Sequence, residues 1–194
     1  ERRESYVDER ATLPAVAMAW RTPDPVTEMA DFLPYVVLGE LLTDGDASRL
    51  AERLVHRDRP ATAVAAHATF MAEPFASRGP TALLIQAFMP PTGDADTVMA
   101  GVGEELARVA EGVDEAELGR VKARVAAQLL RSDDSVLGRA RRLATAQVFH
   151  GDARYATRFT TLLGEVTAES VARAAAAMTP NRRAVIEVVP GGNQ

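Results

Sequence analysis

The order in which short apolar segments and longer helical patterns follow one another is the feature that most constrains this fold. Four segments are short, apolar and bounded by turn residues, so we predict strands at 13–20, 61–71, 80–89 and 184–189. Apolar residues recur at helical spacing over 28–54, 94–111, 114–131, 135–150, 155–163 and 167–178. Because the helices cluster between strands without strict alternation, the order predicts an α+β fold: a mainly antiparallel sheet covered on one face by helices.

Turn residues divide these segments. Pro74 and Gly79 lie between the second and third predicted strands, which favours an antiparallel hairpin. The segment TDGDAS at 43–48 interrupts the first helical pattern, where Gly45 relieves the turn and Ser48 is a candidate N-cap for the helix that follows.

Two later helices also have candidate N-caps. Asp114 precedes an apolar run and has Glu117 three residues later, as in a capping box. The hydroxyl of Thr167 is a candidate cap, although TAES lacks a perfect box. We expect His150 to lie at a helix C-terminus, where the helix dipole favours its charged form.

The chain is long enough for one core, and we expect a single domain over 11–190. The polar start, ERRESYVDER, predicts a linker over 1–10, and GGNQ predicts a frayed end over 191–194. The first residue is not Met, and no apolar leader follows, so we expect a segment of a longer protein.

Charge and cysteine content exclude several classes of function. The net charge of -5 opposes docking to nucleic acid or to an anionic membrane, and we expect neither partner. No apolar run approaches the ~20 residues of a membrane span. The chain has no cysteine, which removes disulfides, thiolate zinc sites and cysteine nucleophiles. We expect a cytoplasmic location.

The three histidines, His56, His67 and His150, give no metal site by spacing. A zincin-type site needs two imidazoles one helical turn apart with a Glu beside the bound water, and no pair here has that spacing. We therefore expect no catalytic residue and no metal ligand in this chain. A serine nucleophile elbow and a Gly-rich phosphate loop are also absent from the sequence.

Charged clusters offer only weak candidates for binding. Arg139, Arg141 and Arg142 could grip a carboxylate, but their place in a helical segment favours a solvated face. Asp133 and Asp134 lie between two helical segments, where a cap or a solvated turn explains them.

Several motifs together carry a resemblance to one protein family. The segment LLTDGDASRL at 41–50 is similar to the G-x-S-S-R-L-like turn that follows a long helix in the second half of pitrilysin-type M16 metallopeptidases. The matching residues are Gly45, Ser48, Arg49 and Leu50. The segment AMAWRTP at 17–23 is similar to the leading strand of that half. Glu117, Leu118 and Lys122 fall on its E-L-x-x-x-K pattern, and the last 29 or so residues complete the likeness across nearly the whole chain.

The resemblance implies a LuxS/MPP-like metallohydrolase fold in which two similar domains close like a clamshell around an extended peptide. In that family only the first half carries the zinc site, so this chain would hold no cofactor, and zinc is expected in the partner half. The implied partners are a zinc-binding M16 domain, in the same chain or another, and a peptide substrate. The implied role is the non-catalytic half that holds substrate.

Two positions depart from the pattern of active relatives. These relatives usually have, after the turn, an Arg and then a Tyr seven residues on, where this chain has Val55 and Thr62. Arg53, Arg57 and Arg59 are close enough in sequence to compensate in another register. The departure favours the alternative of a degenerate homologue with a structural or assembly role, similar to the core proteins of respiratory complexes. A plain ligand-binding domain has no positive feature in its support.

Overall fold

A single mixed sheet organises the molecule. The computed structural model describes residues 2–45, 48–69 and 74–191. Its five strands are β1 (Arg2–Asp8), β2 (Ala15–Arg21), β3 (Ala63–His67), β4 (Ala82–Phe88) and β5 (Arg183–Pro190). They lie in the order β1-β5-β2-β4-β3, and every neighbouring pair is antiparallel except β1 with β5. The predicted hairpin is β3 with β4, and the mainly antiparallel α+β sheet is confirmed.

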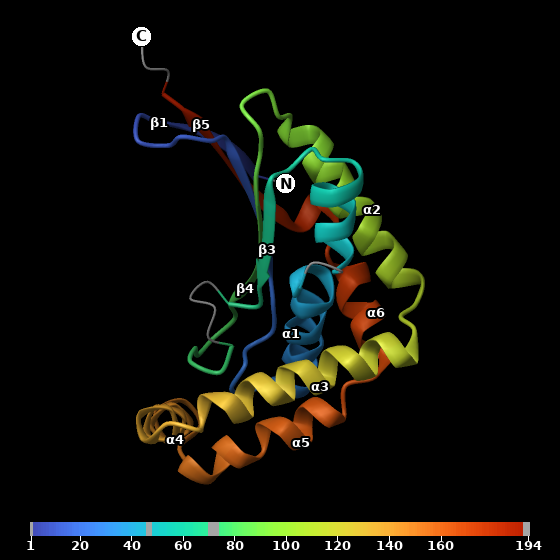
Figure 1. Cartoon of the computed structure of the whole chain (residues 1–194). Coiled ribbons are helices and arrows are strands. Elements are labelled where there is room, and N and C mark those ends of the chain that lie inside the picture. The colour runs from blue at the N-terminus through green and yellow to red at the C-terminus, as the bar shows by residue number, and fades with distance from the viewer. Residues whose placement is uncertain (1, 46–47, 70–73, 192–194) are drawn as a thin grey trace.

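Helices cover one face of this sheet and leave the other bare (Figure 1). The helices that pack on the sheet are α1 (Met29–Thr43), α2 (Ala95–Glu111) and α6 (Ala168–Ala177). At one end of the sheet lie α3 (Glu115–Ser132), α4 (Val136–His150) and α5 (Phe159–Gly164). The short helices are the π-helix η1 (Ala51–Arg57) and the 3-10 turns η2 (Ala153–Thr157) and η3 (Pro180–Arg182).

The core lies between the sheet and its helix layer. Alternate residues of β2 (Val16, Met18 and Trp20) are buried, because successive side chains in a strand point to opposite faces. Strand β4 repeats the pattern with Leu83 and Ile85, and α1 contributes ten buried residues opposite them. The Trp20 Nε1–H donates to Thr179 O at 3.0 Å, so the largest core side chain is also satisfied at its polar end.

Most helix ends follow local signals, and two of the predictions about them are wrong. Asp114 accepts from the Glu117 backbone N–H, as predicted. Thr167 forms a complete capping box with Ser170, so the prediction of an incomplete box is wrong: a Ser side chain returns the hydrogen bond that Glu usually makes. The predicted Ser48 cap is also wrong, because its buried Oγ has no hydrogen-bond partner among the described residues. Residues 46–47 of that turn lie outside the described part.

The chain's start is not the linker that its polarity predicts. Residues 2–8 form β1, which runs parallel to β5 from Arg2 opposite Ala184 to Asp8 opposite Pro190. The strand is at the sheet edge and almost wholly exposed, so its polar composition reflects exposure and not a lack of structure. Residues 192–194 of the expected frayed end lie outside the described residues, and the single domain over 11–190 stays a prediction.

Candidate functional site

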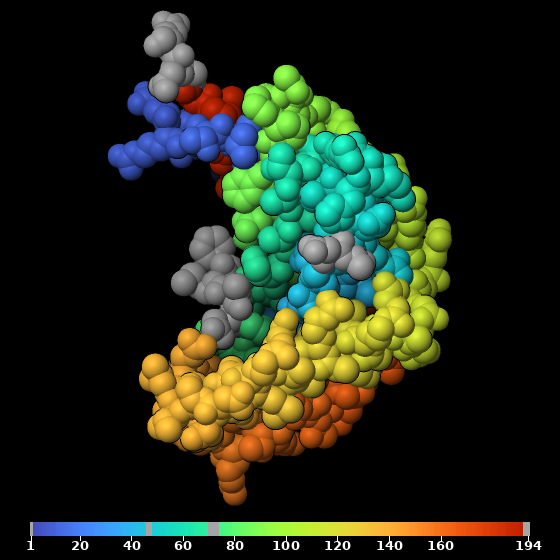
Figure 2. Space-filling view, in the orientation of Figure 1, coloured from blue at the N-terminus to red at the C-terminus, as the bar shows by residue number. Residues whose placement is uncertain are grey.

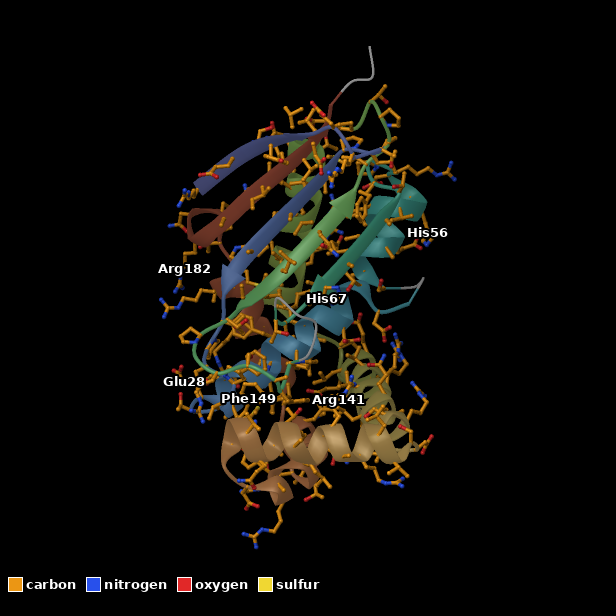
Figure 3. All side chains as sticks on the ribbon, turned by 90° about the vertical axis from the view of Figure 1, so that its left-hand side faces the viewer. Glu28, His56, His67, Arg141, Phe149 and Arg182 are labelled. Carbon is orange, nitrogen blue, oxygen red and sulfur yellow. The ribbon has the colours of Figure 1, made fainter. Side chains whose placement is uncertain are left out.

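The uncovered face of the sheet is the largest feature that the core does not use. The register brings side chains from every strand to this face, since residues two apart share a face. Its centre is small and apolar: Ala15, Ala17 and Ala19 of the central strand β2 lie between Ile186 of β5 and Leu84 of β4. Tyr6, Phe88 and Ile186 are exposed there, although they are large and apolar. Figure 3 looks onto this face.

A hollow occupies this side of the molecule. In the space-filling view it opens between the β1–β5 end of the sheet and α4 (Figure 2). One part has a cavity volume of about 490 Å³ beside the β1–β2 connection. Its lining includes Ala15, Ala17, Gln86, Phe88 and Val188 from the open face. The small side chains of Ala15 and Ala17 leave this space open above the central strand.

The edge strand β3 is partly closed. All five residues of β3 pair with β4, and the backbone N–H of Ala66 points away from the sheet, toward α1. The Ala66 N–H donates to Thr43 Oγ1 at 2.9 Å, and that hydroxyl donates to Gly39 O at 3.1 Å.

The histidines do not assemble into a metal site. His56 lies in the last turn of η1 and His67 lies on β3, in different parts of the view in Figure 3. Across residues 2–45, 48–69 and 74–191, no group of three His, Asp or Glu side chains is placed to hold a metal ion. Neither His56 nor His67 has a second imidazole beside it with which to share an ion.

His150 lies in an aromatic cluster, not in solvent. Its ring stacks on Tyr155 at 4.3 Å and meets the edge of Phe159 at 5.5 Å. Burial lowers the pKa of His150, against the opposing effect of a hydrogen bond to the Phe75 backbone. His150 is the last residue of α4, as predicted, but its burial in the cluster disfavours the charged form.

The family-motif residues form one structural joint. Arg49 makes a bidentate ion pair with Glu117, with Nε to Oε1 at 3.0 Å and Nη2 to Oε2 at 2.6 Å. This pair raises the pKa of Arg49. Leu50 is fully buried, and Gly45 has φ of 87°, a left-handed conformation that favours glycine. The turn after α1 is thus fastened to the start of α3.

Lys122, the last residue of the second motif, also has a structural contact. Its Nζ donates to Gly164 O at 2.6 Å and to Val166 O at 2.7 Å, which satisfies carbonyl groups at the end of α5. Leu118, one turn earlier, is buried. The two motifs therefore position α3 and α5, and none of these contacts reaches the open sheet face.

The arginines that follow the turn are held on the helix side. Arg53 pairs with Glu104, with Glu105 at 3.2 Å and with Asp58 at 3.4 Å. Arg57 pairs with Asp58 at 2.9 Å, and Arg59 donates to His56 O at 3.2 Å.

The two positions that depart from the pattern of active relatives carry no replacement for the missing groups. Val55 lies within η1. Thr62 donates through both its N–H and its hydroxyl to Phe88 O.

Two of the three α4 arginines contact the α3–α4 turn, and one of them binds a carboxylate of this chain. Arg142 pairs with Asp133, and Arg139 donates to Asp133 O at 2.7 Å, so both fasten the α3–α4 turn. Figure 3 shows Arg141 on α4, below the sheet. None of the described helices combines the length and apolarity that a bilayer crossing requires. Sequence reasoning predicted that helices cover one face of the sheet but did not identify the residues of the open face, whose signal is the alternation of Ala with large residues in 15–20.

Comparisons with known proteins identify this architecture. Residues 1–125 match the family model described as the peptidase M16 inactive domain. A comparison with curated proteins finds no match. An inactive peptidase domain from Bordetella parapertussis is similar over 96% of both chains, with a TM-score of 0.80 and 19% identity.

Two longer proteins contain a similar domain. A protease from Helicobacter pylori is similar over 97% of this chain and 44% of the protease, with a TM-score of 0.83 and 18% identity. A chain in complex III from Candida albicans is similar over 96% of this chain and 45% of that chain, with a TM-score of 0.75 and 11% identity. This chain therefore spans less than half of these two proteins. Together with the family match over most of the sequence, the fold leads to one conclusion: the chain belongs to the peptidase M16 family, as an inactive domain.

Proposed function

We propose that this domain is the non-catalytic half of a zinc endopeptidase clamshell and forms the chamber wall opposite a zinc-bearing M16 domain. The observation that carries the proposal is the open sheet face with its alanine floor and its hollow. A soluble domain usually covers both faces of such a sheet or makes the free face polar. Here Tyr6, Phe88 and Ile186 are exposed on it.

An extended peptide fits the shape and chemistry of this face. Small side chains at Ala15, Ala17 and Ala19 leave room for peptide side chains above the sheet, while Gln86 and His67 offer polar contacts near the β3 end. No charged side chain of β2, β4 or β5 interrupts the floor between its ends. The wall would therefore favour peptide segments with uncharged side chains.

Contact through the sheet face is the better-supported mode of binding. Strand addition to the hairpin edge, which the sequence suggested, has little backbone left to use, since β3 has five residues and Thr43 occupies the Ala66 N–H. The other edge strand, β1, pairs only with β5 among the described residues. We therefore assign the peptide to the face of the sheet and not to the β3 edge.

The first experiment compares the full-length product of the parent gene with this chain alone. Bound zinc is measured by elemental analysis, and cleavage is measured on an unfolded peptide under identical conditions. Zinc and cleavage in the longer product only, or after addition of a zinc-bearing partner chain, are the expected result. Zinc-dependent cleavage by this chain alone would contradict the proposal, because its wall would then be catalytic.

A structural or assembly role is the alternative. It is favoured by the missing Arg and Tyr at positions 55 and 62 and by the likeness to a chain of complex III. Under this alternative the full-length protein has neither zinc nor cleavage, and the domain is recovered in a stable complex. The same measurement therefore separates the two functions.

Partners and location follow from charge and composition. The net charge of -5 disfavours nucleic acid and anionic membranes as partners, and we propose neither. A cytoplasmic location also remains a proposal, which fractionation of cells with an antibody to the domain would test.

A further inference from the structure

Helix α4 exposes apolar side chains where a helix normally exposes polar ones. Val136, Leu137, Leu143 and Val148 are 75%, 79%, 46% and 68% exposed. In this 15-residue helix only Ala146 is buried. Scattered exposed apolar residues are ordinary on a protein surface, but four on one helix form a patch that marks an interaction site.

The spacing of these residues gathers them on the outward half of α4. At about 100° per residue, Val136, Leu137, Ala140, Ala144 and Val148 fall within one half of the helix circumference. Residues of the opposite half, including Gly138, Thr145 and Phe149, are partly buried. The exposed arginines Arg139 and Arg141 flank the apolar stripe.

The inward half of α4 is firmly held, so the exposed stripe is not a loose helix. The His150 ring stacks on Tyr155, and Arg78 Nη2 donates to Phe149 O at 3.1 Å. At the other end, Ser135 caps the helix through the Gly138 N–H at 2.9 Å. Contacts at both ends therefore fix which side of the helix faces solvent.

Charge indicates what covers the stripe. Helix α4 carries three arginines and no Asp or Glu, in a chain whose net charge is -5. An apolar patch flanked by arginines is complementary to an apolar patch flanked by carboxylates. Arg142 is paired with Asp133, so the exposed charges that an acidic protein surface would meet are those of Arg139 and Arg141.

The position of α4 indicates which protein would cover the apolar stripe. Helix α4 crosses the lower end of the open sheet face, on the same side of the molecule (Figure 3). A partner docked on α4 would therefore lie beside the open face. We propose that the outward face of α4 is the docking surface for the zinc-bearing M16 domain, which binds it through an apolar patch bordered by Asp and Glu side chains. This inference rests on the proposed function.

The test measures the affinity of this chain for the zinc-bearing domain of its parent protein or partner chain, by calorimetry. Leu137→Glu and Val148→Glu each place a carboxylate in the stripe. Val7→Glu is the matched control, because Val7 is 62% exposed on β1, far from α4 in the sequence and on another element. We expect each α4 variant to weaken binding by about tenfold or more and the control to have wild-type affinity.

Two further readouts keep the result interpretable. Each variant should retain the wild-type circular dichroism spectrum and melting temperature, since the replaced side chains are exposed. Added salt should weaken the wild-type complex, because charge attraction contributes to it. Wild-type affinity in both α4 variants would overturn the docking proposal and leave the chamber-wall proposal standing.

Other outcomes separate the remaining possibilities. A wild-type chain that binds no zinc-bearing domain, from a parent protein without zinc or cleavage, would overturn both proposals. Binding to phosphatidylserine vesicles that is lost in Leu137→Glu, without binding to the zinc-bearing domain, would overturn the docking proposal and assign α4 to a membrane.

Discussion

Two helices of similar length, α2 and α4, bury their residues very differently. Helix α2 has 17 residues, eight of them buried, and α4 has 15 residues with one buried. The apolar residues of α2 face the sheet, whereas four large apolar residues of α4 face solvent. The difference teaches that an apolar stripe can serve either the core of its own domain or a surface between domains, and burial distinguishes the two uses.

A pair of identical substitutions tests this difference most directly. Leu106 of α2 is 3% exposed and Leu137 of α4 is 79% exposed. We expect Leu106→Ala to lower the free energy of unfolding by about 2–5 kcal/mol, because it leaves a cavity in the core. We expect Leu137→Ala to change it by less than about 0.5 kcal/mol. Urea unfolding followed by circular dichroism measures both, and a comparable loss in Leu137→Ala would mean that α4 is covered within the isolated chain.

Glycines in the two helices give a second pair with opposite signs. A Cβ at Gly138 of α4 would lie 1.7 Å from Ser132 O, whereas a Cβ at Gly103 of α2 would meet nothing within 4 Å. Gly138→Ala must therefore shift the backbone of the α3–α4 turn, at a cost of about 1–3 kcal/mol.

The matched change at Gly103→Ala should raise the free energy of unfolding by up to about 1 kcal/mol, since alanine favours a helix more than glycine does. Thermal melting of both variants shows whether each substitution raises or lowers stability. A stabilised Gly138→Ala variant would show that the turn places α4 less rigidly than its contacts indicate.

Local signals made much of this fold predictable from the sequence. Asp114 and Thr167 cap their helices through N–H groups three residues on, and the short apolar run around Met18 predicted the central strand. Each of these features depends on neighbours within a few residues. The family motifs were also visible, because their order in the chain does not depend on the fold.

Features that depend on distant partners were not predictable. Strand β1 resembles a linker in sequence because its pairing partner, β5, follows about 180 residues later. The Arg49–Glu117 pair joins the two motifs only once the chain has folded. Periodicity shows that α4 has an apolar stripe but not whether the domain covers it, and composition likewise hides the burial of His150.

At the C-terminal end of α4, His150 should change the free energy of unfolding at acid pH only. Burial lowers the pKa of His150 in the folded chain below its unfolded value of about 6.5. The unfolded chain therefore binds the proton more readily. The contribution of neutral His150 to the free energy of unfolding is fully present above about pH 6.5 and is lost as pH falls toward the lowered pKa.

The Phe75 backbone, Arg78 and Asp24 are the other groups that act on this ring. The Phe75 hydrogen bond and Asp24 raise the pKa of His150, whereas Arg78 lowers it, and no hydrogen bond of the described residues satisfies His150 Nε2. We expect His150→Phe to flatten the dependence of unfolding free energy on pH below about 6.5 relative to the wild type. Carboxylates shared by both chains cancel in the difference between the two urea-unfolding series. If the difference in unfolding free energy between the wild type and His150→Phe stays constant from pH 7 to pH 5, the His150 ring is solvated. The Tyr155 and Phe159 contacts would then hold the C-terminal end of α4 without desolvating the imidazole.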